Sequence, residues 1–177
     1  MKAIEKELLK QIDNVSGKVI LVGISFDAFI KKIEKSKKIK TVDLLNSIKI
    51  SDKDNKNNKD KSVDIPLKKM RKIYKNKNID YIFIDYNHIS KYLKDFVSHS
   101  IFINKKTIYI VFKSNIEASY VKRLYENYGC KTNLEKIGRS HLLTIDTNNV
   151  KTNKFKDSVL KISVKTEKIL DLIEKYI

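Results

Sequence analysis

The sequence predicts a doubly wound α/β fold with a mostly parallel sheet and an antiparallel hairpin at its C-terminal edge. Two observations support this prediction. Residues 79–85 are apolar throughout 81–84, so neither face of this stretch suits solvent, which is typical of a central parallel strand. Residues 131–136 and 141–146 are joined by a linker too short for a parallel crossover, so they must pair as an antiparallel hairpin.

Length and composition indicate one domain. The chain has 177 residues, which is enough for one well-buried core, and we expect a single domain over 1–177 with its core at 18–146. The longest apolar runs, 19–24 and 108–112, have the length of strands, and the opening residues are charged. We therefore expect no signal peptide, no membrane span and a cytoplasmic protein. The lone Cys130 lacks a partner for an internal disulfide, and we expect it to be a small buried residue.

The chain is strongly basic, with a formal net charge of +17. A Lys-rich surface attracts phosphate backbones through counterion release, so nucleic-acid binding is an open alternative. Of the 38 basic residues, however, only Arg71, Arg123 and Arg139 are arginine. Base readout and bidentate phosphate contacts favour arginine, and a Lys, Ile and Asn excess is also typical of codons that have drifted toward A and T. The charge is therefore weaker evidence than its magnitude suggests.

The N-terminal part of the chain predicts a helix and then a strand-turn-helix unit. Residues 2–14 place apolar side chains on one face and charged ones on the other, which predicts an amphipathic terminal helix. Residues 18–24 predict the first buried strand. The apolar residues after it recur at helical spacing: Phe26, Phe29, Ile30 and Ile33. Residues 41–45 predict a second short strand, which carries Asp43.

The stretch before the central strand is polar. Residues 51–62 contain no apolar side chain, and we expect them to form a mobile loop. Residues 62–65 predict a minimal third strand. Pro66 suits the first turn of a following helix, because the N–H that proline lacks would have no partner there.

The second half of the chain predicts further helices and strands. A helix is expected directly after His88, and 107–112 predicts a fifth strand. Ser114 and Glu117 have the spacing of a capping box for the next helix, which Gly129 should end as a left-handed cap. The expected buried face of that helix is Ile116, Tyr120, Val121, Leu124 and Tyr125. A last amphipathic helix is predicted over 165–177.

The stretch 83–88, together with Tyr92 and Asp95, resembles the fourth strand and following loop of class I S-adenosylmethionine-dependent methyltransferases. The alternation of strands and helices and the final hairpin extend this resemblance over 18–146. It implies a Rossmann-like, methyltransferase-like sheet with strand order 3-2-1-4-5-7-6. It also implies a pocket for S-adenosylmethionine at the carboxyl ends of the parallel strands.

The resemblance implies a set of cofactor-binding residues at successive strand ends. Gly23 and Ser25 match the turn after the first strand. There Ile24 and Phe26 depart from the glycine-rich pattern of the family, and we expect them to add bulk to the pocket. The remaining matches are Asp43 for the ribose hydroxyls, Asp64 for the adenine amino group and Asp85. Each also has a simpler interpretation. The first turn can be a plain strand-to-helix turn, and the aspartates can be turn or helix formers.

Asp85 and His88 are the candidate catalytic residues. A carboxylate at the end of a central strand can orient an acceptor or take its proton, and a histidine can act as a base near neutral pH. Asp85 and Asn115 could also supply oxygen ligands to Mg²⁺. For the metal we favour the simpler interpretation, in which Asp85 or Asn87 caps the helix containing Tyr92 and Ser114 caps the next, and we predict no metal site.

The other histidines and the tyrosines of the second half carry weaker signals. His99 and His141 have no partner at a useful spacing, and we expect them to be surface or satisfied polar residues. Tyr120, Tyr125 and Tyr128 lie at helical spacing beside Arg123, and core packing explains them more simply than base stacking.

Two functional hypotheses follow. The first is an S-adenosylmethionine-dependent methyltransferase whose acceptor, a small molecule or an RNA, the sequence does not identify. The second is a non-catalytic protein of the same fold that acts by binding RNA or a protein partner. The apolar faces of the terminal helices, 2–14 and 165–177, also permit a homo-oligomer.

Overall fold

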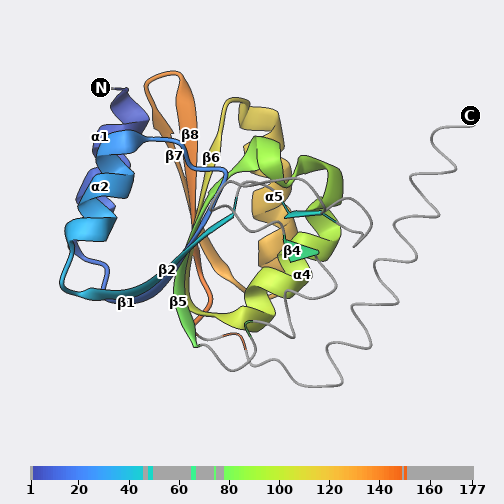
Figure 1. Cartoon of the computed structure of the whole chain (residues 1–177). Helices are drawn as coiled ribbons and strands as arrows, with labels where there is room; N and C mark the ends of the chain where they lie inside the picture. Colours follow the sequence, from blue (N-terminus) through green and yellow to red (C-terminus); the bar gives the residue numbers. More distant parts are fainter. Residues whose placement is uncertain are drawn as a thin grey trace, which may run out of the picture.

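A six-stranded sheet forms the centre of the computed structural model, which describes residues 2–45, 48–49, 65–66, 74, 78–148 and 150 (Figure 1). Its strand order is β2-β1-β5-β6-β8-β7. Strands β2, β1, β5 and β6 run parallel, and β8 is antiparallel to both of its neighbours. The predicted fold class, the central place of residues 79–85 and the antiparallel hairpin are therefore confirmed. The strands are β1 (Gly17–Val22), β2 (Ile39–Leu45), β5 (Ile79–Asp85), β6 (Asn104–Phe112), β7 (Lys131–Ile137) and β8 (Ser140–Asp146).

The predicted third strand is not part of this sheet. Two short strands, β3 (Ile48–Lys49) and β4 (Ile65–Pro66), form a separate parallel pair. Pro66 lies in β4 and pairs with Lys49, so its predicted place in the first turn of a helix is wrong. Proline is tolerated at the edge of a sheet because the missing N–H can face outward. The polar tract at 51–62 and the predicted terminal helix at 165–177 lie outside the described residues.

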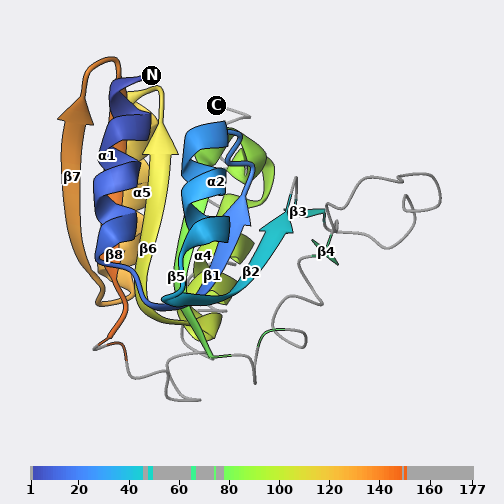
Figure 2. The ribbon, with the colours of Figure 1, turned by 60° about the vertical axis from the view of Figure 1, so that its left-hand side comes forward.

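The helices cover the two faces of the sheet in pairs (Figures 1 and 2). Helices α1 (Ala3–Asp13) and α2 (Asp27–Lys35) pack on one face, and α4 (Leu93–Ile103) and α5 (Asn115–Asn127) pack on the other. The predicted terminal helix is confirmed, and its buried residues recur at i, i+4 and i+8. The helix expected directly after His88 starts later. Two 3-10 turns, η2 (Tyr86–His88) and η3 (Ser90–Tyr92), come before α4.

Aromatic rings pack at the middle of the sheet. Phe83 of β5 has no exposed surface, and its ring lies 5.1 Å from that of Phe29 on α2 and 4.7 Å from that of Tyr109 on β6. Burial raises the pKa of the Tyr109 hydroxyl above its ordinary value. On the opposite face, Tyr86 and Phe112 lie 4.8 Å apart. The apolar run that predicted a central strand thus contributes side chains to the cores on both faces of the sheet.

Helix α5 buries a narrower stripe than we predicted. Ile116 is 82% exposed and Tyr120 is 45% exposed, so both predictions of burial are wrong. The sheet and α4 contact only one side of this helix, and Ile116 and Tyr120 lie next to each other at i and i+4 outside that contact. The residues of α5 that do pack inward are Ala118, Val121, Leu124 and Tyr125.

Both ends of α5 and the residues after it agree with the predictions. Ser114 Oγ accepts a hydrogen bond from the Glu117 N–H at 3.5 Å, and Gly129 follows the helix with φ +82°. Tyr125 is fully buried, with its hydroxyl 2.8 Å from Ser100 Oγ. Cys130 is a buried free thiol, and burial raises its pKa to about 12.

Candidate functional site

Gly23 lies at the carboxyl end of β1 in the left-handed conformation, with φ +65°. A Cβ built on it would collide with the imidazole of His88, lying 2.7 Å from Nε2 and closer still to the nearest ring carbon. Only glycine therefore allows this close approach between the first turn and His88 of η2, the 3-10 turn after β5. The structure brings together two residues that we assigned to different roles, one in cofactor binding and one in catalysis.

The two bulky residues of the first turn do not enter the site. Ile24 is buried, with 4% of its surface exposed, in the core between the sheet and helices α1 and α2. Phe26 is half-buried and packs against the same core. The expectation that Ile24 and Phe26 add bulk to the pocket is therefore wrong, because strand and turn geometry direct them inward. The space in front of Gly23 is instead filled by His88.

Asp85 ends β5 beside this turn. Val22 pairs with Ile84, so the residues that follow, Gly23 and Asp85, lie at the same edge of the sheet. Asp85 Oδ1 accepts hydrogen bonds from the Asn87 backbone N–H at 3.0 Å and from Asn87 Nδ2 at 2.7 Å, which caps η2. Asp85 is thus a cap, as predicted, but of η2 and not of the turn that contains Tyr92, η3, which has no side-chain cap. Its other oxygen, Oδ2, accepts no hydrogen bond from any residue that the structure describes.

Of the other predicted cofactor residues, the structure describes Ser25 and the backbone of Asp43. Ser25 is exposed in the turn that leads to α2. Asp43 lies inside β2, paired with Ile20 and before the last residue of the strand, Leu45. Our placement of Asp43 at the end of the strand is therefore wrong, because β2 continues beyond it to Leu45. Asp64 lies outside the described residues.

The structure adds little to the metal hypothesis. Within the described part of the chain, no cluster of three or more His, Cys, Asp or Glu side chains could hold a metal ion. Asn115 is the first residue of α5, next to the capping Ser114. His141, which we expected to be exposed or satisfied, has a buried Nδ1 without a hydrogen-bond partner among the described residues. It follows the first residue of β8, Ser140, and pairs with the buried Phe112.

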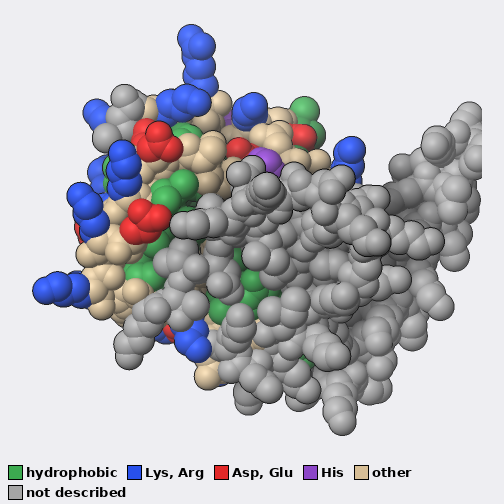
Figure 3. Space-filling model, in the orientation of Figure 1, with side chains coloured by type: hydrophobic (Ala, Val, Ile, Leu, Met, Phe, Trp, Pro, Cys, Tyr) green, Lys and Arg blue, Asp and Glu red, His purple; other side chains and the backbone are tan. Residues whose placement is uncertain are grey.

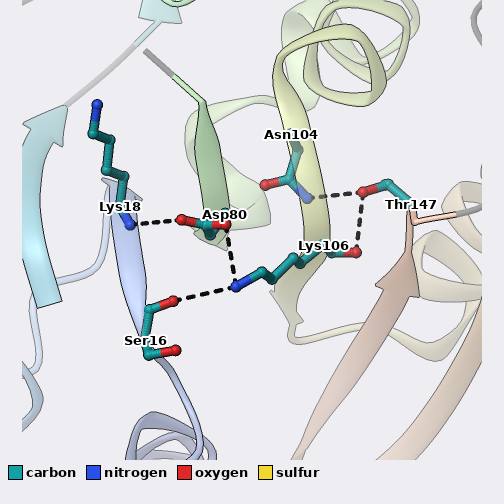
Figure 4. A network of polar contacts seen from close by, with 6 residues as sticks. All are labelled: Ser16, Lys18, Asp80, Asn104, Lys106 and Thr147. Atoms are coloured by element: carbon teal, nitrogen blue, oxygen red, sulfur yellow. Dashed lines mark hydrogen bonds and ion pairs between the residues drawn. The ribbon is translucent and has the colours of Figure 1, made fainter. Parts of the chain in front are cut away.

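The opposite, amino edge of the sheet carries a polar network that we did not predict (Figure 4). Gly17 has φ +118°, and a Cβ built on it would collide with the Asp80 carboxylate. Asp80 Oδ2 accepts a hydrogen bond from the Lys18 N–H at 2.9 Å, and Oδ1 pairs with Lys106 Nζ at 3.2 Å. Lys106 Nζ also donates to the Ser16 carbonyl at 3.4 Å. Two features of the sequence could have indicated this network. Asp80 lies inside a mostly apolar strand, and Gly17 is the first residue of β1.

A second part of the same edge fixes the end of the hairpin. Asn104 Nδ2 donates to Thr147 Oγ1 at 3.0 Å, and the Thr147 N–H donates to the Lys106 carbonyl at 2.8 Å. Asn104 is buried, and its Oδ1 has no hydrogen-bond partner in the described residues. These contacts join β6 to the residue after β8 at the amino edge.

The basic side chains do not gather in one patch on the face shown in Figure 3. Lys and Arg side chains stand out singly on the part of this face that is not grey, and Asp and Glu side chains lie between them. None of the helices in the described ranges is both long and apolar enough to cross a membrane.

The fold is that of known methyltransferases. No family model and no curated protein matches the sequence. Precorrin-6y C5,15-methyltransferase from Geobacter metallireducens superposes with a TM-score of 0.54 at 10% identity, over 80% of this chain and 86% of that one. A ribosomal RNA methyltransferase from Plasmodium falciparum superposes with a TM-score of 0.49 at 17% identity, over 80% of this chain and 94% of that one. The first comparison shows the fold, and at this identity it shows the fold alone.

Proposed function

We propose that the protein is an S-adenosylmethionine-dependent methyltransferase. The observation that supports this most is the left-handed Gly23 at the end of β1, directly beside Asp85 and His88 at the end of β5. In open α/β sheets the ligand crevice lies at the carboxyl ends of the strands, which is the edge where these three residues meet. The solved structure that shares this fold with a TM-score of 0.54 is a methyltransferase.

The residues at this edge fit a cofactor with one adjustment. Gly23 leaves a space that a Cβ would fill, so a ligand can approach the backbone there, and neither Ile24 nor Phe26 points into it. The imidazole of His88 must turn aside first. Gly23 and Ser25 would then hold the cofactor, and contacts from Asp43 to the ribose and from Asp64 to the adenine remain predictions from the resemblance.

The side chains of this edge suit methyl transfer to an oxygen or nitrogen atom. The cofactor, when bound, supplies an electrophilic methyl group. Asp85 Oδ2 is available to accept a hydrogen bond from an acceptor O–H or N–H, because Oδ1 already holds the turn. His88 is exposed and can take the proton that the acceptor loses. Most of the rate enhancement would come from positioning the acceptor in line with the methyl group.

Calorimetric titration of S-adenosylhomocysteine into the pure protein tests the proposal. We expect saturable binding, weakened at least tenfold, or by about 1.4 kcal/mol, in Asp43→Ala if this carboxylate holds the ribose. Asp27→Ala is the matched control, because Asp27 is an exposed aspartate in the first turn of α2. If the folded wild-type protein gives no heat at millimolar ligand, the proposal is wrong.

A non-catalytic role is the second candidate, and the ring of His88 over Gly23 favours it. If that ring never leaves, the fold serves as a binding scaffold, and the net charge of +17 suits an RNA partner. We then expect RNA affinity to fall steeply between roughly 50 and 200 mM salt, measured by filter binding. RNA binding without S-adenosylhomocysteine binding would favour this candidate over the enzyme.

A further inference from the structure

The imidazole of His88 occupies the place where a ligand would approach Gly23. The glycine has no side chain and a positive φ, which leaves its Cα face open, and in this structure His88 covers that face at contact distance. We propose that His88 is the gate of the cofactor site: it closes the site when no cofactor is bound and turns aside on binding. This inference rests on the proposed function and assigns a residue that controls cofactor affinity.

The ring of His88 is free to move while its backbone is held. His88 is exposed, and its imidazole makes no hydrogen bond with any residue that the structure describes. The backbone on either side is fixed, because Asp85 caps the turn through Asn87 and the Ile89 N–H donates to the Tyr86 carbonyl at 3.0 Å. Opening therefore needs only a change of side-chain rotamer, which an exposed residue makes within nanoseconds.

The gate reduces the observed cofactor affinity. A ligand that binds only the open state sees its affinity lowered by the fraction of molecules in which the site is open. If one of three staggered rotamers covers Gly23 and packing favours that rotamer, the open fraction is on the order of one tenth to one third. Removing the ring should then strengthen binding about threefold to tenfold.

Opening also places the base. The Cα of His88 stays at the carboxyl edge next to Asp85, so an imidazole that leaves Gly23 remains at the same edge. The same rotation of the His88 ring therefore opens the cofactor site and brings the imidazole to the acceptor. The ring cannot cover Gly23 and accept a proton from the acceptor at once.

The test is calorimetric titration of S-adenosylhomocysteine into wild-type protein, His88→Ala and His88→Phe. His88→Ala should bind about threefold to tenfold more tightly than wild type, and His88→Phe, which keeps a ring over Gly23, should bind no more tightly. His141→Ala is the matched control, since His141 lies on β8, separated from β5 by β6, and should bind like wild type. Circular dichroism checks that each variant is folded.

A second readout follows the ring itself. The His88 imidazole proton resonance, identified by its absence in His88→Ala, should shift on titration of the wild-type protein with S-adenosylhomocysteine, and the His141 resonance should not. Equal or weaker binding by His88→Ala, with wild type binding, overturns the gate and leaves the proposed function intact. No binding by either folded protein overturns both.

Discussion

The two ends of β1 use the same device and differ in how it is held. At each end a glycine with positive φ is covered by a side chain that comes from β5 or from the turn after it: Gly17 by Asp80, and Gly23 by His88. Asp80 is fixed by the Lys18 N–H and by Lys106, whereas His88 is exposed and has no hydrogen bond to the described residues. Both contacts between glycine and side chain are thus part of the folded structure. They differ in the hydrogen bonds of the covering side chain, which hold Asp80 in place and are absent for His88 among the described residues.

Substitution of the two glycines should give the largest difference in stability between the two ends of β1. Gly17→Ala places a Cβ against an anchored carboxylate at a φ of +118°, and the free energy of unfolding should fall by about 4 kcal/mol from backbone strain and broken hydrogen bonds. Gly23→Ala meets a movable ring at φ +65° and should cost about 1 kcal/mol. Urea denaturation measures both values. Equal losses would mean that His88 is held as firmly as Asp80.

Removal of the anchored cover should have the next largest effect. Asp80→Ala leaves the Lys18 N–H and the Lys106 ammonium without their partner, and we expect a loss of about 2 kcal/mol in the free energy of unfolding. The control is Asp13→Ala, because Asp13 forms a 2.6 Å ion pair with Lys32 and its side chain is 63% exposed. That variant should change stability by less than about 0.5 kcal/mol. A comparable loss in both would show that the network at the amino edge contributes little.

Alkaline pH should weaken the half of the core near the amino edge. Burial raises the pKa of Cys130 from 9.0 to about 12 and raises that of Tyr125 from 10.0, so both groups lose protons more readily in the unfolded chain. The contribution of the thiol is complete below pH 9 and is lost as the pH rises toward 12, whereas that of the tyrosine begins to fall only above pH 10. We expect stability to fall by at most about 1.4 kcal/mol per pH unit for the thiol. Cys130→Ala should flatten the slope just above pH 9.

Removal of the movable cover should have the smallest effect on stability. His88→Ala deletes an exposed ring without a hydrogen bond to the described residues, so the free energy of unfolding should change by less than about 0.5 kcal/mol. The contrast with Asp80→Ala in the same denaturation experiment tests the comparison directly. A loss near that of Asp80→Ala would show that His88 is a structural residue.

The sequence predicted the sheet well because buried parallel strands have few alternatives. The apolar run at 81–84 required burial on both faces, and the short link at 137–140 allowed only a hairpin. The same reasoning placed Asp85 and His88 at the end of the central strand; Gly23 came from the resemblance, and the structure brings the three together. These predictions depend on local pattern and chain length, which the sequence states directly.

The rest of the site depended on information that no local pattern contains. The place of Asp43 depends on how far β2 continues past it, and the resemblance, which put Asp43 at the strand end, does not contain that information. The inward direction of Ile24 and Phe26 depends on the packing of α1 and α2. The pairing of Gly17 with Asp80 joins residues far apart in the chain, so neither residue alone predicts it.

The exposed face of α5 offers a way to observe the carboxyl edge. The chain contains no tryptophan and nine tyrosines, so its native ultraviolet signals come from tyrosine and phenylalanine. Tyr125 and Tyr109 are buried, whereas Tyr120 is 45% exposed on the helix that starts beside this edge. A Tyr120→Trp protein would carry a single indole at that position. Excited at wavelengths beyond the tyrosine absorption band, its fluorescence would report events there without background from the buried tyrosines.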